Sequence, residues 1–91
     1  MIKSFRHKGL KELFEKGASG RIAAPLYSRC LRRLTVIDNA AKLENISLPG
    51  FNFHPLHTTP RRYSVHVNGP WCITFEWIDG EALHVDLEQY H

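Results

Sequence analysis

The chain has 91 residues, of which 43% are hydrophobic and 23% are charged, and its formal net charge is +3 at pH 7. This length predicts a single domain, residues 1–91, built around one core. No apolar run reaches the length of a membrane-spanning helix, and the start MIKSFRHKGLKELF lacks the apolar segment of a signal peptide, so we expect a cytoplasmic protein with no membrane association.

The first elements predicted along the chain are a short strand candidate, IKSF, and a short amphipathic helix in HKGLKELFEKG. Leu10, Leu13 and Phe14 are spaced i, i+3 and i+4, which places them on one helix face. Gly17 then supplies a helix stop. This helix is therefore expected to pack one apolar face on the core.

A second, longer helix is predicted in PLYSRCLRRLTVIDNAAKL, because Pro25 suits a first helical position. The segment ENISLPG is expected to end it. Its apolar stripe is predicted to comprise Tyr27, Leu31, Leu34, Ile37 and Ala41. The opposite, solvated side is predicted to carry Arg29, Arg32 and Arg33.

After Gly50 the hydrophobic period changes from 3.6 to about 2, which is the period of strands. The segments YSVHV, WCITFEW and LHVDL alternate apolar and polar residues, and turn sequences NGP and DGE separate them. The sequence therefore predicts an α+β fold, in which two N-terminal helices pack on a small twisted antiparallel sheet.

The alternation also predicts how the last two strands pair. A two-residue turn at DG would place Trp77 opposite Ala82. A three-residue loop, DGE, places Trp77 opposite Leu83, Phe75 opposite Val85 and Ile73 opposite Leu87, and it keeps the apolar face unbroken. We therefore expect the longer loop.

A three-residue loop at NGP likewise pairs Val67 with Trp71, His66 with Cys72 and Val65 with Ile73, and it keeps Pro70 out of the ladder. The polar face of the sheet then continues to Tyr90, at the end of the chain. The other members of this face are predicted to be Ser64, His66, Cys72, Thr74, Glu76, His84, Asp86 and Glu88.

Imidazole, phenol and guanidinium groups gather around this polar face. The loop NFHPLHTTPRR and the chain end contribute His54, His57, Arg61, Arg62, Tyr90 and His91. Metal-free RNA cleavage requires a base for the 2′-hydroxyl, an acid for the leaving 5′-oxygen and cations for the charged phosphorane. The plainer interpretation is that a half-buried antiparallel sheet normally has a polar outer face, on which Cys72 is a small packed residue.

A metal site is the other use that six histidines suggest. No HExxH, CxxC or His-x-His spacing is present, however, and Cys30 and Cys72 are too far apart in sequence to form a paired motif. We therefore expect no metal and no cofactor, and we expect both cysteines to be reduced thiols.

The motifs resemble, in their order, those of the HigB-type toxins of the RelE/ParE superfamily. MIKSF, HPL, the hairpin YSVHVNGPWCITFEW with its DG turn, and the terminal YH carry this similarity over the whole chain. The resemblance implies a microbial RNase-like (RelE-like) fold and an mRNA interferase. Such a toxin of a type II toxin-antitoxin system would enter the A site of the 70S ribosome, cleave mRNA and inhibit translation.

The resemblance also implies partners and site residues. The partner would be a HigA-like helix-turn-helix antitoxin, and functional positions of the family fall on His54, Tyr90 and His91. His54 and His91 would act as general base and acid, in an order that the sequence leaves open. Tyr90 would stack on a base or hold the substrate. The residues expected to face the phosphates are His57, His66, Arg61 and Arg62.

The sequence departs from the family pattern at RNA-contacting positions. Relatives tend to have arginine in place of His66 and Cys72, lysine in place of His57, and aspartate in place of Gln89. Arginine makes permanently charged, bidentate phosphate contacts, so these changes predict a weaker toxin. The alternative is a binding protein, either a ParE-like gyrase inhibitor or a degenerate toxin that acts as an antitoxin-bound co-repressor.

Overall fold

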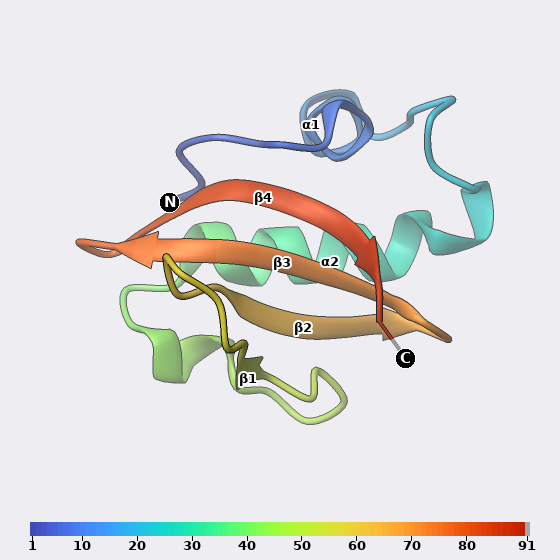
Figure 1. Ribbon diagram of the computed structural model, residues 1–91. Helices are drawn as coiled ribbons and strands as arrows, with labels where there is room; N and C mark the ends of the chain where they lie inside the picture. Colours follow the sequence, from blue (N-terminus) through green and yellow to red (C-terminus); the bar gives the residue numbers. More distant parts are fainter. Residues whose placement is uncertain (91) are drawn as a thin grey trace.

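A four-stranded antiparallel sheet with the order β1-β2-β3-β4 forms the centre of the molecule, with the long helix α2 across one face and α1 beside β4 (Figure 1). This computed structural model describes residues 1–90. The elements are α1 (Lys8–Lys16), η1 (Ala24–Leu26), α2 (Tyr27–Asn39), η2 (Leu43–Ile46), β1 (His54–Pro55), β2 (Tyr63–Asn68), β3 (Trp71–Ile78) and β4 (Glu81–Gln89). The predicted α+β class is confirmed. Within residues 1–90, no helix is long and apolar enough to span a membrane.

The predicted first helix is confirmed as α1. Leu10 and Leu13 are fully buried in the core, and Phe14 packs against it. Gly17 ends the helix with a φ of 82°, which a glycine adopts without strain, and its N–H donates to the Leu13 carbonyl at 2.8 Å. Ahead of α1, the strand candidate IKSF forms two single parallel bridges to β4 and thereby covers the edge of the sheet.

The predicted second helix begins later and ends earlier than expected. Pro25 lies in the single turn η1, and Ala41 lies beyond the end of α2 and is exposed. The prediction that Arg33 lies on the solvated side is wrong, since only 5% of its surface is exposed. Its guanidinium lies 4.5 Å from the centre of the Phe51 ring, and its Nε donates to the His66 carbonyl at 2.7 Å. A cation stacked on an aromatic ring and hydrogen-bonded to the backbone can be buried.

The predicted pairing of the β2–β3 hairpin is confirmed except at the turn. Val65 pairs with Ile73 and His66 pairs with Cys72, as expected. At the turn, however, Trp71 pairs with Asn68 instead of Val67, because the register shifts between His66 and Asn68. The face on which each side chain of the site lies is unaffected.

The β3–β4 turn differs from the prediction. Ile78 pairs with Glu81 across a two-residue turn, in which Asp79 and Gly80 have φ angles of 51° and 77°. Two central residues with positive φ form the type I′ turn, whose twist matches that of a hairpin. The turn therefore places Trp77 opposite Ala82, and the expected three-residue loop is wrong.

A β-bulge then restores the predicted register farther along the hairpin. His84 and Val85 together oppose the single residue Phe75, and His84 has a φ of 52°. Beyond this extra residue, Ile73 pairs with Leu87 as predicted. Ala82, Val85 and Leu87 therefore all face the core, although Ala82 and Val85 are three residues apart and a regular strand would place core residues two apart.

Cys30 is a free thiol at the centre of the core, with no exposed surface. Burial raises its pKa from 9.0 to about 11, and the Arg33 charge acts weakly in the opposite direction. The native state therefore holds the thiol proton more tightly than the unfolded chain does. The contribution of this thiol to the free energy of unfolding is fully present below about pH 9. It is lost as the pH rises toward about 11, which lowers the free energy of unfolding by roughly 2 to 3 kcal/mol.

We expect this loss to be smaller in Cys30→Ala, which has no thiol to titrate. Urea unfolding of both proteins at about pH 8 and about pH 10.5 measures it, and the informative quantity is the difference between the two pH dependences. Equal pH dependence in the two proteins would show that the buried thiol does not contribute.

Candidate active site

Strand pairing arranges polar side chains in rows on the outer face, which we define as the sheet face opposite α2. Directly paired residues point to the same face of a sheet. One row across the strands contains His54, Ser64, Thr74 and Asp86. The next row contains His66, Cys72 and Glu88. The predicted polar face is confirmed for these residues, and the two-residue strand β1 adds His54 to it. The prediction that Leu83 lies on the apolar face opposite Trp77 is wrong, since the two-residue turn shifts the pairing by one residue and Leu83 pairs with Glu76 on the outer face.

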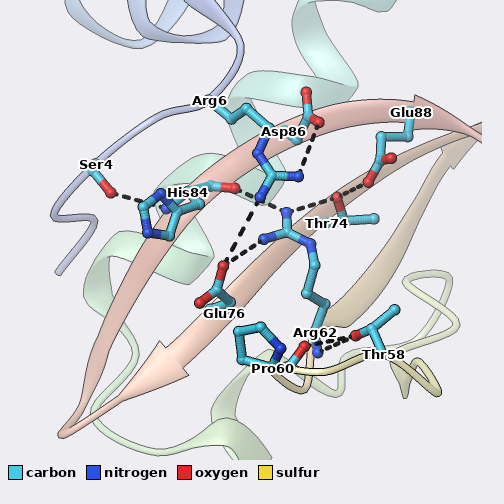
Figure 2. Close-up of polar contacts among 10 residues, drawn as sticks. All are labelled: Ser4, Arg6, Thr58, Pro60, Arg62, Thr74, Glu76, His84, Asp86 and Glu88. Carbon is cyan, nitrogen blue, oxygen red and sulfur yellow. Dashed lines mark hydrogen bonds and ion pairs between the residues drawn. The ribbon is translucent and has the colours of Figure 1, made fainter.

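The Arg62 side chain lies over this outer face, among Thr74, Glu76 and the His84 carbonyl (Figure 2). Its Nη1 donates to Glu76 Oε2 at 3.1 Å, and its Nη2 donates to Thr74 Oγ1 at 3.0 Å and to the His84 carbonyl at 2.8 Å. Only 7% of its surface is exposed. The structure therefore places this predicted phosphate contact inside a buried ion pair, whereas Arg61 beside it is exposed.

The segment around Arg62 is itself held in place. The Arg62 N–H donates to Thr58 Oγ1 at 2.9 Å, and the Thr58 hydroxyl donates to the Pro60 carbonyl at 2.9 Å. On the other side, the bulge at His84 presents the carbonyl that Arg62 binds, and the His84 N–H donates to Ser4 Oγ at 2.9 Å. In a regular ladder the His84 carbonyl would accept a hydrogen bond from the neighbouring strand. The bulge leaves this carbonyl available to Arg62.

Arg6, from the segment before α1, is a second cation at this face. Its Nη1 lies 3.8 Å from Asp86 Oδ2, and its Nη2 lies 4.0 Å from Glu76 Oε2. About half of its side chain is exposed. The outer face thus combines two arginines with the carboxylates of Glu76, Asp86 and Glu88, and Figure 2 shows all five groups.

The orientation of His54 identifies its basic nitrogen. His54 Nδ1 lies 2.8 Å from the Asn52 carbonyl. A carbonyl can only accept, so Nδ1 carries the proton, and in a neutral imidazole Nε2 is then left with a free lone pair. His66 has the opposite arrangement, because its Nε2 lies 2.9 Å from the Gly69 carbonyl. The exposed His54 therefore presents Nε2 as a proton acceptor.

Tyr90 extends β4 by one residue along the same outer face. The Tyr90 N–H donates to the Pro70 carbonyl at 2.8 Å, and 42% of the Tyr90 surface is exposed. Partial burial and then the Glu88 charge raise the pKa of the Tyr90 phenol, so its ring stays neutral at physiological pH. Gln89 is exposed and pairs with Trp71. The predicted site residue His91 lies outside the described residues.

The structure brings some of the predicted site residues together and leaves others apart. His66 and Cys72 share a row, while His57 and Arg61 are exposed in the loop before β2. Sequence reasoning missed the ion pairs of Arg6 and Arg62. A signal for them exists in the alternation of β3 and β4, which places Glu76, Asp86 and Glu88 on one face. Three neighbouring carboxylates require cations nearby.

No group of three or more histidine, cysteine, aspartate or glutamate residues within residues 1–90 is arranged to hold a metal ion. The described side chains of the outer face carry imidazole, phenol, thiol, hydroxyl, carboxylate and guanidinium groups.

Two helices packed with a four-stranded antiparallel sheet are the architecture of the RelE-like toxins. The sequence model of the family "RelE-like toxin of type II toxin-antitoxin system HigB" matches residues 3–91. The chain therefore belongs to the HigB family, and as a type II toxin it has an antitoxin partner.

Two curated relatives support this membership. The chain is similar to "Endoribonuclease HigB" of Proteus vulgaris, with 41% identity over 92 residues that cover 100% of both chains. It is also similar to "Toxin HigB-1" of Vibrio cholerae, with 27% identity over 93 residues that cover 99% of this chain and 98% of the relative. The resemblance found from the motifs is thus confirmed.

Proposed function

We propose that this HigB-family toxin is an endoribonuclease that cleaves mRNA on the 70S ribosome by metal-independent acid-base chemistry and thereby inhibits translation. Its relative in Proteus vulgaris, which is 41% identical over the full length, is named an endoribonuclease. The structural observation that carries the proposal is the free Nε2 of His54 on the outer face, fixed as a proton acceptor by the Asn52 carbonyl.

In this mechanism, His54 Nε2 takes the proton of the 2′-hydroxyl as the 2′-oxygen attacks the adjacent phosphorus. The bond from phosphorus to the 5′-oxygen breaks, and a general acid returns a proton to that oxygen. His91 is our candidate for the acid. His57, His66 and Arg61 face the phosphate, and Tyr90 holds the substrate.

Dependence on the ribosome is supported by the weak phosphate-binding capacity of this face. The guanidinium of Arg62 is already bonded to Glu76, and His66 and Cys72 stand where relatives tend to have arginine. A site with few cations available to bind phosphate gains most when another molecule aligns the 2′-hydroxyl with the phosphate. The ribosome is the partner that would hold mRNA in this way.

We further propose that the antitoxin is a HigA-like helix-turn-helix protein. The positive net charge of the toxin favours association with an acidic partner surface. The absence of arginine at positions 66 and 72 also favours a second candidate function, that of a binding protein: a ParE-like gyrase inhibitor or a degenerate, antitoxin-bound co-repressor.

Cleavage assays with purified toxin test the proposal. We expect cuts in mRNA on programmed ribosomes, slow cleavage of the same RNA without ribosomes, and unchanged rates in the presence of EDTA. Toxin saturated with its antitoxin is the matched control and should be inactive. Loss of activity on chelation would contradict the metal-independent mechanism, and gyrase inhibition without mRNA cuts would favour the binding protein.

A further inference from the structure

A buried hydrogen-bond relay ends at Glu88. Arg62 Nη2 donates to Thr74 Oγ1 at 3.0 Å, and the Thr74 hydroxyl is hydrogen-bonded to Glu88 Oε2. A guanidinium has only donors, so Thr74 accepts from Arg62 and gives its single proton to Glu88. Thr74 has no exposed surface. The relay therefore has one direction and holds the Glu88 carboxylate in one orientation.

Glu88 occupies the end of the outer face next to an exposed aromatic ring. Strand alternation places Tyr90 on the same side of β4 as Glu88, while Gln89 between them points to the other side. Tyr90 as a residue is 42% exposed, so its side chain is accessible to a base. Partial burial and then the Glu88 charge raise the pKa of the Tyr90 phenol, as expected for a ring on this side of the strand.

The distances across the sheet suit a nucleotide. Glu88 pairs with Cys72, and Cys72 pairs with His66, so two strand spacings, roughly 10 Å, separate the backbones that carry His66 and Glu88. This span is similar to the reach from the phosphate of a nucleotide to the far edge of its base. A nucleotide with its phosphate near His66 can therefore direct its base toward Glu88 and Tyr90.

A fixed carboxylate beside an aromatic ring has a defined preference among bases. The ring stacks on any base, but a carboxylate accepts a hydrogen bond from an exocyclic amino group and repels a carbonyl oxygen. Adenine, cytosine and guanine carry an amino group, whereas uracil carries none. A hydrogen bond to a charged group contributes about 1.5 to 3 kcal/mol, which corresponds to roughly ten- to a hundredfold discrimination.

The plainer role of the relay is to hold the segment around Arg62 on the sheet. That role requires the Arg62–Glu76 pair, but it does not require Glu88, which is partly exposed.

Building on the proposed endoribonuclease function, we propose that Glu88 and Tyr90 form a nucleobase subsite that selects bases with an exocyclic amino group next to the scissile phosphate. The base stacks on the Tyr90 ring and donates its amino hydrogen to the Glu88 carboxylate. Thr74 is a positioning residue, because it acts through Glu88.

Substrates that differ by one amino group test the subsite. Ribosome-bound mRNAs carry adenosine, purine riboside, cytidine or uridine at the position before the cut. The wild-type toxin should cleave the adenosine RNA about tenfold or more faster than the purine riboside RNA, and the cytidine RNA faster than the uridine RNA by a similar factor. In Glu88→Gln these two rate ratios should fall several-fold. The control variant is Glu44→Gln, which replaces an exposed carboxylate on η2, and its rate ratios should equal those of the wild type.

Two variants at position 74 test the relay. Thr74→Ser keeps the hydroxyl and should keep the selectivity for amino-bearing bases. Thr74→Val replaces threonine with a residue of similar shape but without the hydroxyl, and this variant should lose the selectivity even where its total cleavage rate is preserved. NMR titration with adenosine 3′-monophosphate and uridine 3′-monophosphate gives a readout independent of cleavage, and the adenosine nucleotide should bind more tightly and shift the Tyr90 ring signals.

Equal cleavage of the amino-bearing and amino-lacking RNAs by an active wild-type toxin would overturn the subsite and leave the endoribonuclease function intact. If the wild-type toxin cleaved no RNA at all, the proposed function would fail, and the nucleotide titration would then decide the subsite: equal binding of the two nucleotides would overturn it.

Discussion

Replacing Arg62 with methionine should lower the free energy of unfolding by about 3 to 5 kcal/mol. The substitution leaves the Glu76 carboxylate, only 11% exposed, without its partner at 3.1 Å. Arg6 lies 4.0 Å away and is half exposed, so it compensates weakly. A domain of this size has a total stability of roughly 5 to 15 kcal/mol, so the variant is expected to be close to unfolding at growth temperature.

A double-mutant cycle separates the attraction between Arg62 and Glu76 from the cost of leaving one of the two charges buried and unpaired. Arg62→Met with Glu76→Met removes both charges, and we expect this protein to be more stable than Arg62→Met alone. Urea unfolding measures all four proteins of the cycle: the wild type, Arg62→Met, Glu76→Met and the double variant. The exposed pair between Arg21 and Glu12, at 3.4 Å, is the matched control, and Arg21→Met should change stability by about 1 kcal/mol or less. A double variant less stable than Arg62→Met would contradict this account.

The elements that the sequence predicted well are those in which periodicity and burial agree. Leu10 and Leu13 have helical spacing and are both fully buried in α1. The pairing of Ile73 with Leu87 follows from alternation in both strands, because a slip of one residue would expose one of them. The polar face of the sheet was predictable for the same reason.

The β3–β4 turn could not be predicted because two irregularities compensate each other. The two-residue turn at Asp79 and Gly80 shifts the alternation by one residue, and the bulge at His84 shifts it back. The prediction placed the extra residue in the loop, where it also preserves the register. Nothing in the pattern indicates that a histidine adopts a positive φ, since this conformation is uncommon outside glycine.

The buried arginines were missed because charge predicts exposure on average. Arg33 and Arg62 are buried, at 5% and 7% exposure, since each finds acceptors that are distant in sequence. Arg33 binds the carbonyl of His66, and Arg62 binds Glu76. Such contacts depend on the tertiary fold and have no local sequence signature. Arg62 illustrates the consequence for the site, because a phosphate contact expected from the sequence is committed to an internal carboxylate.

His54→Ala should lower the rate of ribosome-dependent cleavage by about a hundredfold or more. The substitution removes Nε2, whose lone pair is free because Nδ1 is bonded to the Asn52 carbonyl at 2.8 Å. His54 is exposed, lies in the two-residue strand β1 and makes no contribution to the core, so folding and antitoxin binding should be preserved. Single-turnover cleavage rates and thermal unfolding of the two proteins measure both effects.

The tautomer of His54 provides an independent test of the same step. In ¹⁵N NMR spectra of the neutral imidazole, we expect the proton on Nδ1, since the Asn52 carbonyl accepts from that nitrogen. His84→Asn is the matched control for the kinetics: it removes an exposed imidazole at the bulge, and asparagine tolerates the φ of 52° there, so cleavage should be nearly unchanged. If His54→Ala were as active as this control, another group would have to accept the 2′-hydroxyl proton, and His54 would only bind the substrate.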